Sequence, residues 1–280
     1  MMKSNNEIAE EQARAWNGPS GRAWVENQQQ LDEVFRPFEA LLVEPLAVSQ
    51  TRVLDVGCGT GATTLAAARR LGSGGQASGI DLSEPMIAMA HDRARREGSS
   101  ARFIRANAQE YAFDAASADV IMSRFGVMFF DDPVKAFANL RRAGAAGATL
   151  RCIVWRGAED NPFMTTAERA AAPFLPELPA RESDGPGQFA FADADRVLTI
   201  LRESGWTKSE IQPLDVPCTM PEAALVRYVT QLGPVGRILQ EADEATRARV
   251  VEVVRPAFDP FVNGPDVRFT AACWMVTARV

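Results

Sequence analysis

The sequence is poor in side chains that bind transition metals. It contains one histidine, His91, and none of its four cysteines belongs to a C-x-x-C pair. A structural zinc site needs clustered nitrogen or sulfur ligands, so we expect no metal site. We expect buried, reduced thiols at the four cysteine positions instead. These are Cys58, Cys152, Cys218 and Cys273.

Clusters of basic residues are also missing. Lysine and arginine total 30 against 36 aspartate and glutamate residues, which gives a formal net charge of −6. A surface that binds nucleic acid usually needs clustered lysine and arginine. Arg93, Arg95 and Arg96 have instead the spacing of a solvated helix face. We therefore expect no nucleic-acid partner.

Long apolar runs are absent as well. No run approaches the length that spans a membrane, and residues 1–14 are polar and charged, unlike a secretory signal. We expect a cytoplasmic protein, a monomer or homodimer, that makes no membrane contact. The 280 residues, 46% of them hydrophobic, suffice for one large domain or one domain with an elaborated cap.

Short apolar runs alternate with helical patterns in the middle of the chain. Strands are expected at residues 52–56, 76–80, 102–105, 118–123 and 149–155. The intervening helices are expected at residues 61–71, 83–97 and 131–142. Ser83 is expected to cap the second of these helices, and Asp131 or Asp132 to stand at the start of the third. This rhythm predicts an α/β fold with a doubly wound parallel sheet.

The two ends of the chain and a central insertion depart from this rhythm. Residues 1–49 read as helices and are predicted to form an N-terminal helical lid. The core is predicted to comprise residues 50–156, 193–220 and 265–280, with strands at 206–216 and 267–280. Residues 157–192 and 221–264 are predicted to be cap insertions over the active site.

The stretch VLDVGCGTG, residues 53–61, joins the first expected strand to the first expected helix. Glycines at such a turn let the backbone approach a ligand and adopt positive φ. The letters GCGTGA also satisfy the dinucleotide fingerprint G-x-G-x-x-G/A. The motif alone therefore leaves at least two cofactors open.

Two acidic residues bear on that choice. Asp55 lies at the strand tip under the turn, where a carboxylate would repel a pyrophosphate. S-Adenosylmethionine carries an ammonium and a sulfonium and no phosphate, so Asp55 favours it. Asp81, at the tip of the second strand, can accept hydrogen bonds from ribose hydroxyls of either ligand, or can act as a helix cap.

With its GIDLSEPMI segment, residues 79–87, the sequence resembles class I S-adenosylmethionine-dependent methyltransferases. It is most similar to the small-molecule branch that includes ubiquinone and menaquinone C-methyltransferases. The resemblance covers residues 53–155. It implies a seven-stranded sheet in the order 3-2-1-4-5-7-6, with an antiparallel last strand and, here, a helical cap.

The resemblance also implies a set of cofactor contacts. The turn around the methionine part comprises Asp55, Gly57, Cys58, Gly59 and Gly61. Further contacts are carried over to Asp81, Leu82, Met86, Asn107, Ala108, Gln109 and Ser123. Asn107 departs from the family pattern, which often has an acid there. In the N-terminal segment, Trp16 and Arg22 are candidates for closing over the cofactor, and packing by two tryptophans is the alternative.

Substrate contacts are expected after the fourth strand, at Arg124, Phe125, Met128 and Phe129. These aromatic residues suggest an apolar or aromatic metabolite. No catalytic base is assigned. Arg124 and Tyr228 are candidates for a catalytic role, and methyl transfer can proceed mainly by positioning.

Three other functions remain open at this point. A nicotinamide-dependent oxidoreductase would share the glycines and Asp81, but it disagrees with Asp55 and lacks a Tyr-x-x-x-Lys pair. A non-catalytic protein that binds S-adenosylmethionine or S-adenosylhomocysteine would keep the whole motif. A third alternative uses the same pocket for a cyclisation or decarboxylation.

Overall fold

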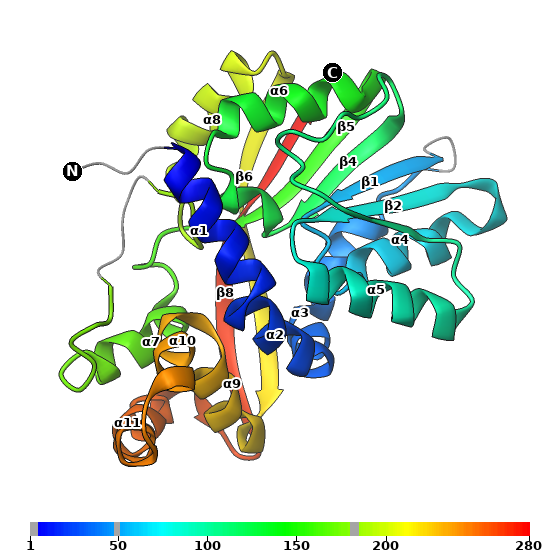
Figure 1. Cartoon of the computed structure of the whole chain (residues 1–280). Helices are drawn as coiled ribbons and strands as arrows, with labels where there is room; N and C mark the ends of the chain where they lie inside the picture. Colours follow the sequence, from blue (N-terminus) through cyan, green and yellow to red (C-terminus); the bar gives the residue numbers. More distant parts are fainter. Residues whose placement is uncertain (1–4, 48–50, 180–184) are drawn as a thin grey trace.

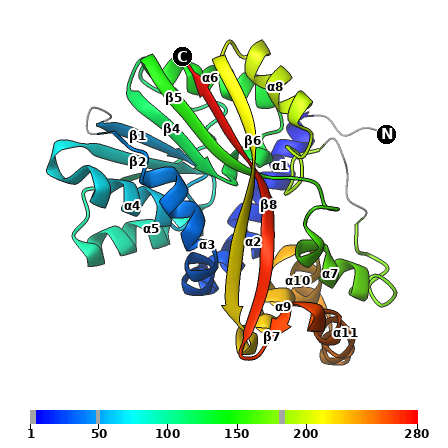
Figure 2. The same ribbon diagram turned by 180° about the vertical axis from the view of Figure 1, so that it is seen from behind.

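The computed structural model describes residues 5–47, 51–179 and 185–280. It contains one eight-stranded sheet of order β3-β2-β1-β4-β5-β8-β6, with β7 paired to β8 outside this path (Figures 1 and 2). The strands are β1 Arg52–Val56, β2 Gln76–Asp81, β3 Arg102–Arg105, β4 Ala118–Arg124, β5 Gly144–Trp155, β6 Thr207–Pro221, β7 Val262–Asn263 and β8 Asp266–Arg279.

The strand pairing agrees with the predicted topology. The first five strands pair in parallel, and β8 lies antiparallel between β5 and β6. The two-residue β7 is an addition to the seven predicted strands, and it forms a hairpin with β8. Four strands are longer than predicted. β2 and β4 each extend by one residue, whereas β5 begins earlier, at Gly144, and β6 continues to Pro221.

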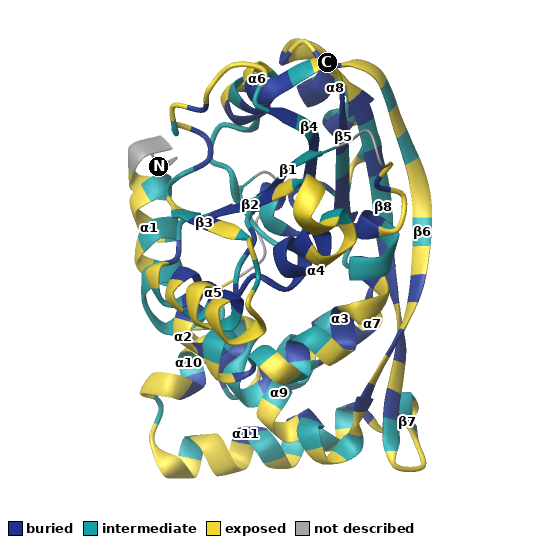
Figure 3. Ribbon diagram, turned by 90° about the vertical axis from the view of Figure 1, so that its right-hand side faces the viewer, coloured by how far each residue is buried: buried dark blue, intermediate teal, exposed yellow. Residues whose placement is uncertain are grey.

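Helices cover both faces of the sheet. On one face lie α3 Gln28–Val43, α4 Ala62–Leu71 and α5 Glu84–Glu97, and on the other lie α6 Pro133–Ala143 and α8 Ala194–Glu203 (Figure 1). The start of α6 is fixed by Asp132, whose side chain accepts a hydrogen bond from the Lys135 amide at 2.9 Å. Buried residues fill the central strands, whereas β6 at the sheet edge is mostly exposed (Figure 3).

The remaining helices extend the fold at the carboxyl ends of the parallel strands. The N-terminal segment forms α1 Asn5–Asn17 and α2 Pro19–Glu26 before α3. The late group consists of α7 Pro162–Ala171, α9 Leu225–Gln231, α10 Gly233–Glu241 and α11 Glu244–Ala257, gathered beside the far ends of β6 and β8 (Figure 1). The predicted lid and the first predicted insertion include residues 1–4, 48–49 and 180–184, which lie outside the described residues.

Candidate functional site

The turn after β1 is held against β2 by its backbone. The amides of Gly57 and Cys58 donate to the Ile80 carbonyl at 2.8 and 3.1 Å. Gly57, Gly59 and Gly61 have φ of +66°, +54° and +88°, a region that favours glycine. The glycine pattern in the sequence therefore corresponds to a conformation that other residues adopt only under strain.

Gly57 also touches the turn after β4. A Cβ on Gly57 would lie 2.5 Å from the Cα of Gly126. The two turns at the tips of β1 and β4 thus meet backbone to backbone. Gly126 is a site residue that the sequence analysis missed, because its constraint comes from a partner about seventy residues away in the chain.

Asp55 is buried beneath this turn. Its side chain is 1% exposed, and Oδ2 accepts a hydrogen bond of 2.7 Å from the Thr64 hydroxyl of α4. Oδ1 has no hydrogen-bond partner. Burial raises the pKa of Asp55 to about 7, against the opposing effects of the Thr64 hydrogen bond and the Arg124 charge. The site thus holds a buried carboxyl group, one oxygen of which has no hydrogen-bond partner.

Asp81 holds the glycine turn from the tip of β2. Its Oδ2 accepts from the Gly59 amide and its Oδ1 from the Ser83 amide, both at 2.8 Å. Burial raises the pKa of Asp81, and these amides act in the opposite direction. Each carboxylate oxygen retains a second lone pair for a ligand hydroxyl. Met86 lies beside the turn, with Sδ 3.4 Å from the Cβ position of Gly59, and Leu82 is half-buried.

The segment after β3 is anchored to the start of α6. The Asn107 side chain accepts a hydrogen bond from the Gln109 amide at 3.0 Å, and the Gln109 side chain accepts one from the Asp132 amide at 3.0 Å. The Ala108 carbonyl is bound by Asn139 at 2.9 Å. The Asn107 amide side chain therefore shapes its own turn, a role that its carboxylate counterpart in the family pattern could also fill.

Ser123 joins β1 to the turn after β4. Its hydroxyl donates to the Val56 carbonyl at 2.7 Å and accepts from the amides of Gly126 and Val127 at 3.1 and 3.3 Å. These bonds use the donor and both lone pairs of the hydroxyl. The Ser123 hydroxyl is therefore a structural link between the tips of β1 and β4, and the assignment of Ser123 as a cofactor contact stays a prediction.

Arg124 points toward α3 and its carboxylates. Its Nη1 lies 3.4 Å from the Phe35 carbonyl, and its guanidinium lies over the Phe35 ring. Burial lowers the pKa of Arg124, while the charges of Asp32, Asp55 and Glu39 raise it. The guanidinium thus already has anionic neighbours, and the predicted roles of Arg124 in substrate binding and catalysis stay predictions.

Two of the predicted substrate residues belong to the core. Phe125 stacks on Trp155 with ring centroids 4.8 Å apart, and Met128 is 1% exposed. Both side chains therefore pack in the core of this structure, and the predicted substrate contacts at these two positions stay predictions. Phe125 has φ +67°, a strained conformation that is commonly found at functional sites. The ring of Phe129 meets that of Trp16 of α1 edge to face, with centroids 5.1 Å apart.

The end of α1 docks on the start of α5. The Trp16 carbonyl accepts a hydrogen bond of 2.6 Å from the Ser83 hydroxyl. The Asn17 side chain accepts one of 2.9 Å from the Glu84 amide. Ser83 thus occupies the N-cap position without capping α5 through its side chain, and Asn17, a residue that the sequence analysis missed, does so instead. Arg22 is exposed on α2, between buried Gly21 and Ala23, and its predicted contact with the cofactor stays a prediction.

The other candidate for catalysis lies in the late helical group. The Tyr228 hydroxyl of α9 contacts the Met164 sulfur at 3.9 Å, and burial raises the pKa of the phenol. A phenol of raised pKa holds its proton more firmly, so these surroundings do not favour Tyr228 as a base. His91 is exposed on α5. Within residues 5–47, 51–179 and 185–280, no cluster of metal ligands is present, and no helix is long and apolar enough to cross a membrane.

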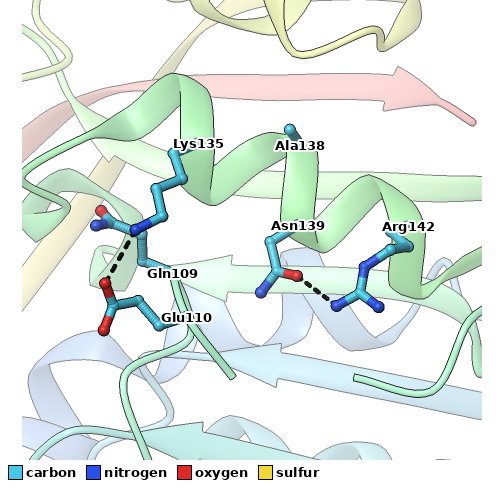
Figure 4. Close-up of a pocket in the computed structure, with 6 residues that line it drawn as sticks. All are labelled: Gln109, Glu110, Lys135, Ala138, Asn139 and Arg142. Carbon is cyan, nitrogen blue, oxygen red and sulfur yellow. Dashed lines mark hydrogen bonds and ion pairs between the residues drawn. The ribbon is translucent and has the colours of Figure 1, made fainter. Parts of the chain in front are cut away.

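Two polar grooves lie beside α6. One, of about 410 Å³, is lined in part by Asn107, Gln109 and Asp131. Its neighbour, of about 490 Å³, is crossed by the Lys135–Glu110 ion pair at 2.9 Å (Figure 4). Neither groove is lined by a residue of the glycine turn. The smaller groove nevertheless includes Asn107 and Gln109, two of the predicted cofactor contacts.

Comparisons with known proteins agree with this geometry. A family model described as a methyltransferase domain matches residues 53–147. Aklanonic acid methyltransferase DauC of Streptomyces sp. is 38% identical over 111 residues, 38% of this chain and 50% of DauC. The ubiquinone/menaquinone biosynthesis C-methyltransferase UbiE of Idiomarina loihiensis is 33% identical over 175 residues, 58% of this chain and 68% of UbiE. This chain belongs to the class I S-adenosylmethionine-dependent methyltransferases.

Membership in this family confirms the predicted cofactor, S-adenosylmethionine. Among solved structures, the YcgJ protein of Bacillus subtilis superposes on this methyltransferase with a TM-score of 0.58 at 16% identity, covering 87% of this chain and 98% of YcgJ. That likeness concerns the fold. The matched region of this methyltransferase spans half the length of DauC.

Proposed function

We propose that this chain transfers the methyl group of S-adenosylmethionine to a small apolar or aromatic metabolite, mainly by positioning the two reactants. The observation that carries the proposal is the buried carboxyl of Asp55, whose Oδ1 has no partner beneath a glycine turn. A buried polar atom without a hydrogen bond is costly. An ammonium group satisfies that oxygen, whereas a pyrophosphate would be repelled by it.

The residues at the strand tips fit this cofactor. Asp55 is suited to the methionine ammonium, directly or through water. Asp81, oriented by the amides of Gly59 and Ser83, is suited to the ribose hydroxyls. The segment 107–109 borders the place expected for the adenine. When bound, S-adenosylmethionine supplies an activated methyl group, so the protein needs to orient the acceptor and exclude water.

The helices beyond the strand tips support the exclusion of water. We propose that residues 1–49 act as a lid and that 157–192 and 221–264 act as a cap. The two parts are joined, because Asn27 donates to the Gln231 side chain at 2.8 Å and Arg227 donates to the Glu26 carbonyl at 2.8 Å. Such contacts let the lid and the cap close as one cover.

The surroundings of the lid favour an apolar acceptor. Trp16 contacts both Trp24 and Phe129 edge to face, and the Arg124 charge is directed to α3. No base is assigned, so the acceptor must offer an atom that is nucleophilic without one. We further propose a cytoplasmic protein, monomeric or homodimeric, without nucleic-acid partners.

The activity is tested by transfer of a labelled methyl group from S-adenosylmethionine to a panel of phenols, quinols and polyketide acids. We expect label on at least one aromatic acceptor, and none with the Asp81→Ala variant. Binding of the cofactor without transfer to any acceptor would favour the non-catalytic alternative. Conversion of an acceptor without label would indicate a cyclisation or decarboxylation.

A further inference from the structure

Helix α3 presents two carboxylates to arginines from other elements. Asp32 and Glu39 are seven residues apart and therefore share a helix face. Asp32 forms an ion pair of 2.7 Å with Arg93 of α5, and Glu39 lies 3.7 Å from Arg69 of α4. The first pair is mostly shielded, since the Arg93 and Asp32 side chains are 13% and 23% exposed. Solvent and salt screen such a pair less than a surface pair.

Arg93 also holds the glycine turn. Its Nη1 donates to the Thr60 carbonyl at 2.9 Å, and the same nitrogen lies 3.4 Å from the Thr60 hydroxyl. Thr60 lies between Gly59 and Gly61, and the Gly59 amide is held by Asp81. The turn is thus fixed on one side by an acid and on the other by an arginine.

The guanidinium of Arg93 makes the contacts with α3 and with the glycine turn through two different nitrogens. Nη2 binds Asp32 of α3 and Nη1 binds the carbonyl of the turn. A planar guanidinium fixes both directions at once, which a lysine ammonium does not. We propose that Asp32 and Arg93 are positioning residues that make cofactor affinity depend on the docking of α3. This inference rests on the proposed function, because the turn matters only if it binds the cofactor.

The proposal is tested by a double-mutant cycle on binding of S-adenosylhomocysteine, measured by calorimetry. We expect Arg93→Gln and Asp32→Asn each to weaken binding about tenfold, and the double variant to weaken it by a similar factor rather than a hundredfold. Arg93→Lys should lose about threefold, because one ammonium replaces two fixed donors.

The matched control is Arg69→Gln. Arg69 also links α3 to its neighbours, through Glu39 and Glu97, but it does not touch the glycine turn. Its variant should bind S-adenosylhomocysteine like the wild type, and melting temperatures report folding of every variant. If Arg93→Gln does not fold, Asp32→Asn is compared with Arg69→Gln instead. The proposal then predicts weaker binding of S-adenosylhomocysteine in Asp32→Asn alone.

The outcomes separate this inference from the proposed function. Wild-type affinity in folded Arg93→Gln and Asp32→Asn variants, or additive losses in the double variant, would overturn the coupling and leave the proposed function standing. Equal loss in Arg69→Gln would also overturn it, since any loosening of α3 would then suffice. A wild-type chain that binds neither S-adenosylmethionine nor S-adenosylhomocysteine would overturn both.

Discussion

At the scale of single residues, Asp55 has the most unusual environment in the site. A carboxyl that is 1% exposed and has one unpartnered oxygen is retained at a cost to folding. Its pKa of about 7 means that both protonation states are populated at neutral pH. A bound cation favours the ionised state, so cofactor binding below this pKa must release a proton.

Cofactor affinity should therefore depend on pH. Because the ionised form of Asp55 binds the ammonium, the Kd for S-adenosylhomocysteine should rise about tenfold between pH 8 and pH 6. Calorimetry at several pH values measures this rise. The Asp55→Asn variant should bind weakly with little dependence in this range. If log Kd changed with pH equally in the wild type and in Asp55→Asn, a group other than Asp55 would be responsible for the pH dependence.

The sequence predicted the positions of site residues where the local motif determines them. The two acids at the strand tips follow from the motif and the ends of the strands. Arg22, Ser123 and Phe125 could not be placed, because their orientation depends on which helix face is buried or on partners in other turns. Gly126 was missed for the same reason, since it is defined by a contact with the glycine turn. The assignment of Arg93 to a solvated helix face was wrong, because its side chain is only 13% exposed and binds both Asp32 and the Thr60 carbonyl.

At the scale of elements, α5 depends on a cap from outside its own sequence. Ser83 gives its hydroxyl to Trp16, and Asn17 binds the Glu84 amide in its place. The N-terminal segment and the helix that follows β2 therefore stabilise one another.

Loss of that cap should cost stability. Asn17→Ala should lower the free energy of unfolding by about 1 kcal/mol, as for other N-cap side chains. Urea denaturation measures the change. Asn17→Asp keeps an acceptor oxygen at the helix start and should retain most of the stability. Equal losses in the two variants would contradict the capping role.

The edge strand β6 shows how an element limits assembly. Pro213, Pro217 and Pro221 are spaced by four residues, an even number, so their backbone nitrogens point to the same side of the strand. None of the three has an amide hydrogen to donate. β6 pairs with β8 throughout this stretch, and a proline cannot donate a hydrogen bond to β8. The nitrogens of the three prolines are therefore expected to point away from β8, toward the open edge of the sheet. They block pairing of β6 with a second sheet edge, so a homodimer would need another surface.

At the scale of the whole molecule, the strand order followed from the family resemblance, and only the short β7 and the strand ends differed. A two-residue strand such as β7, or a longer strand end, forms because a neighbouring strand offers hydrogen bonds. The local sequence pattern does not predict such a neighbour. The long connection between β6 and β8 was recognised as helical. Its attachment through Gln231 to Asn27, at the junction of α2 and α3, was not predictable, because 204 residues separate the two side chains in sequence.

The central claim is that the turn over Asp55 holds S-adenosylmethionine. The most direct measurement is calorimetric titration of the full chain with S-adenosylmethionine, S-adenosylhomocysteine and NAD in parallel, with Asp81→Ala and Gly59→Val as variants that should fold. We predict micromolar binding of the first two ligands, none of NAD, and loss of binding in both variants. Binding of NAD alone, or unchanged affinity in both variants, would contradict the account.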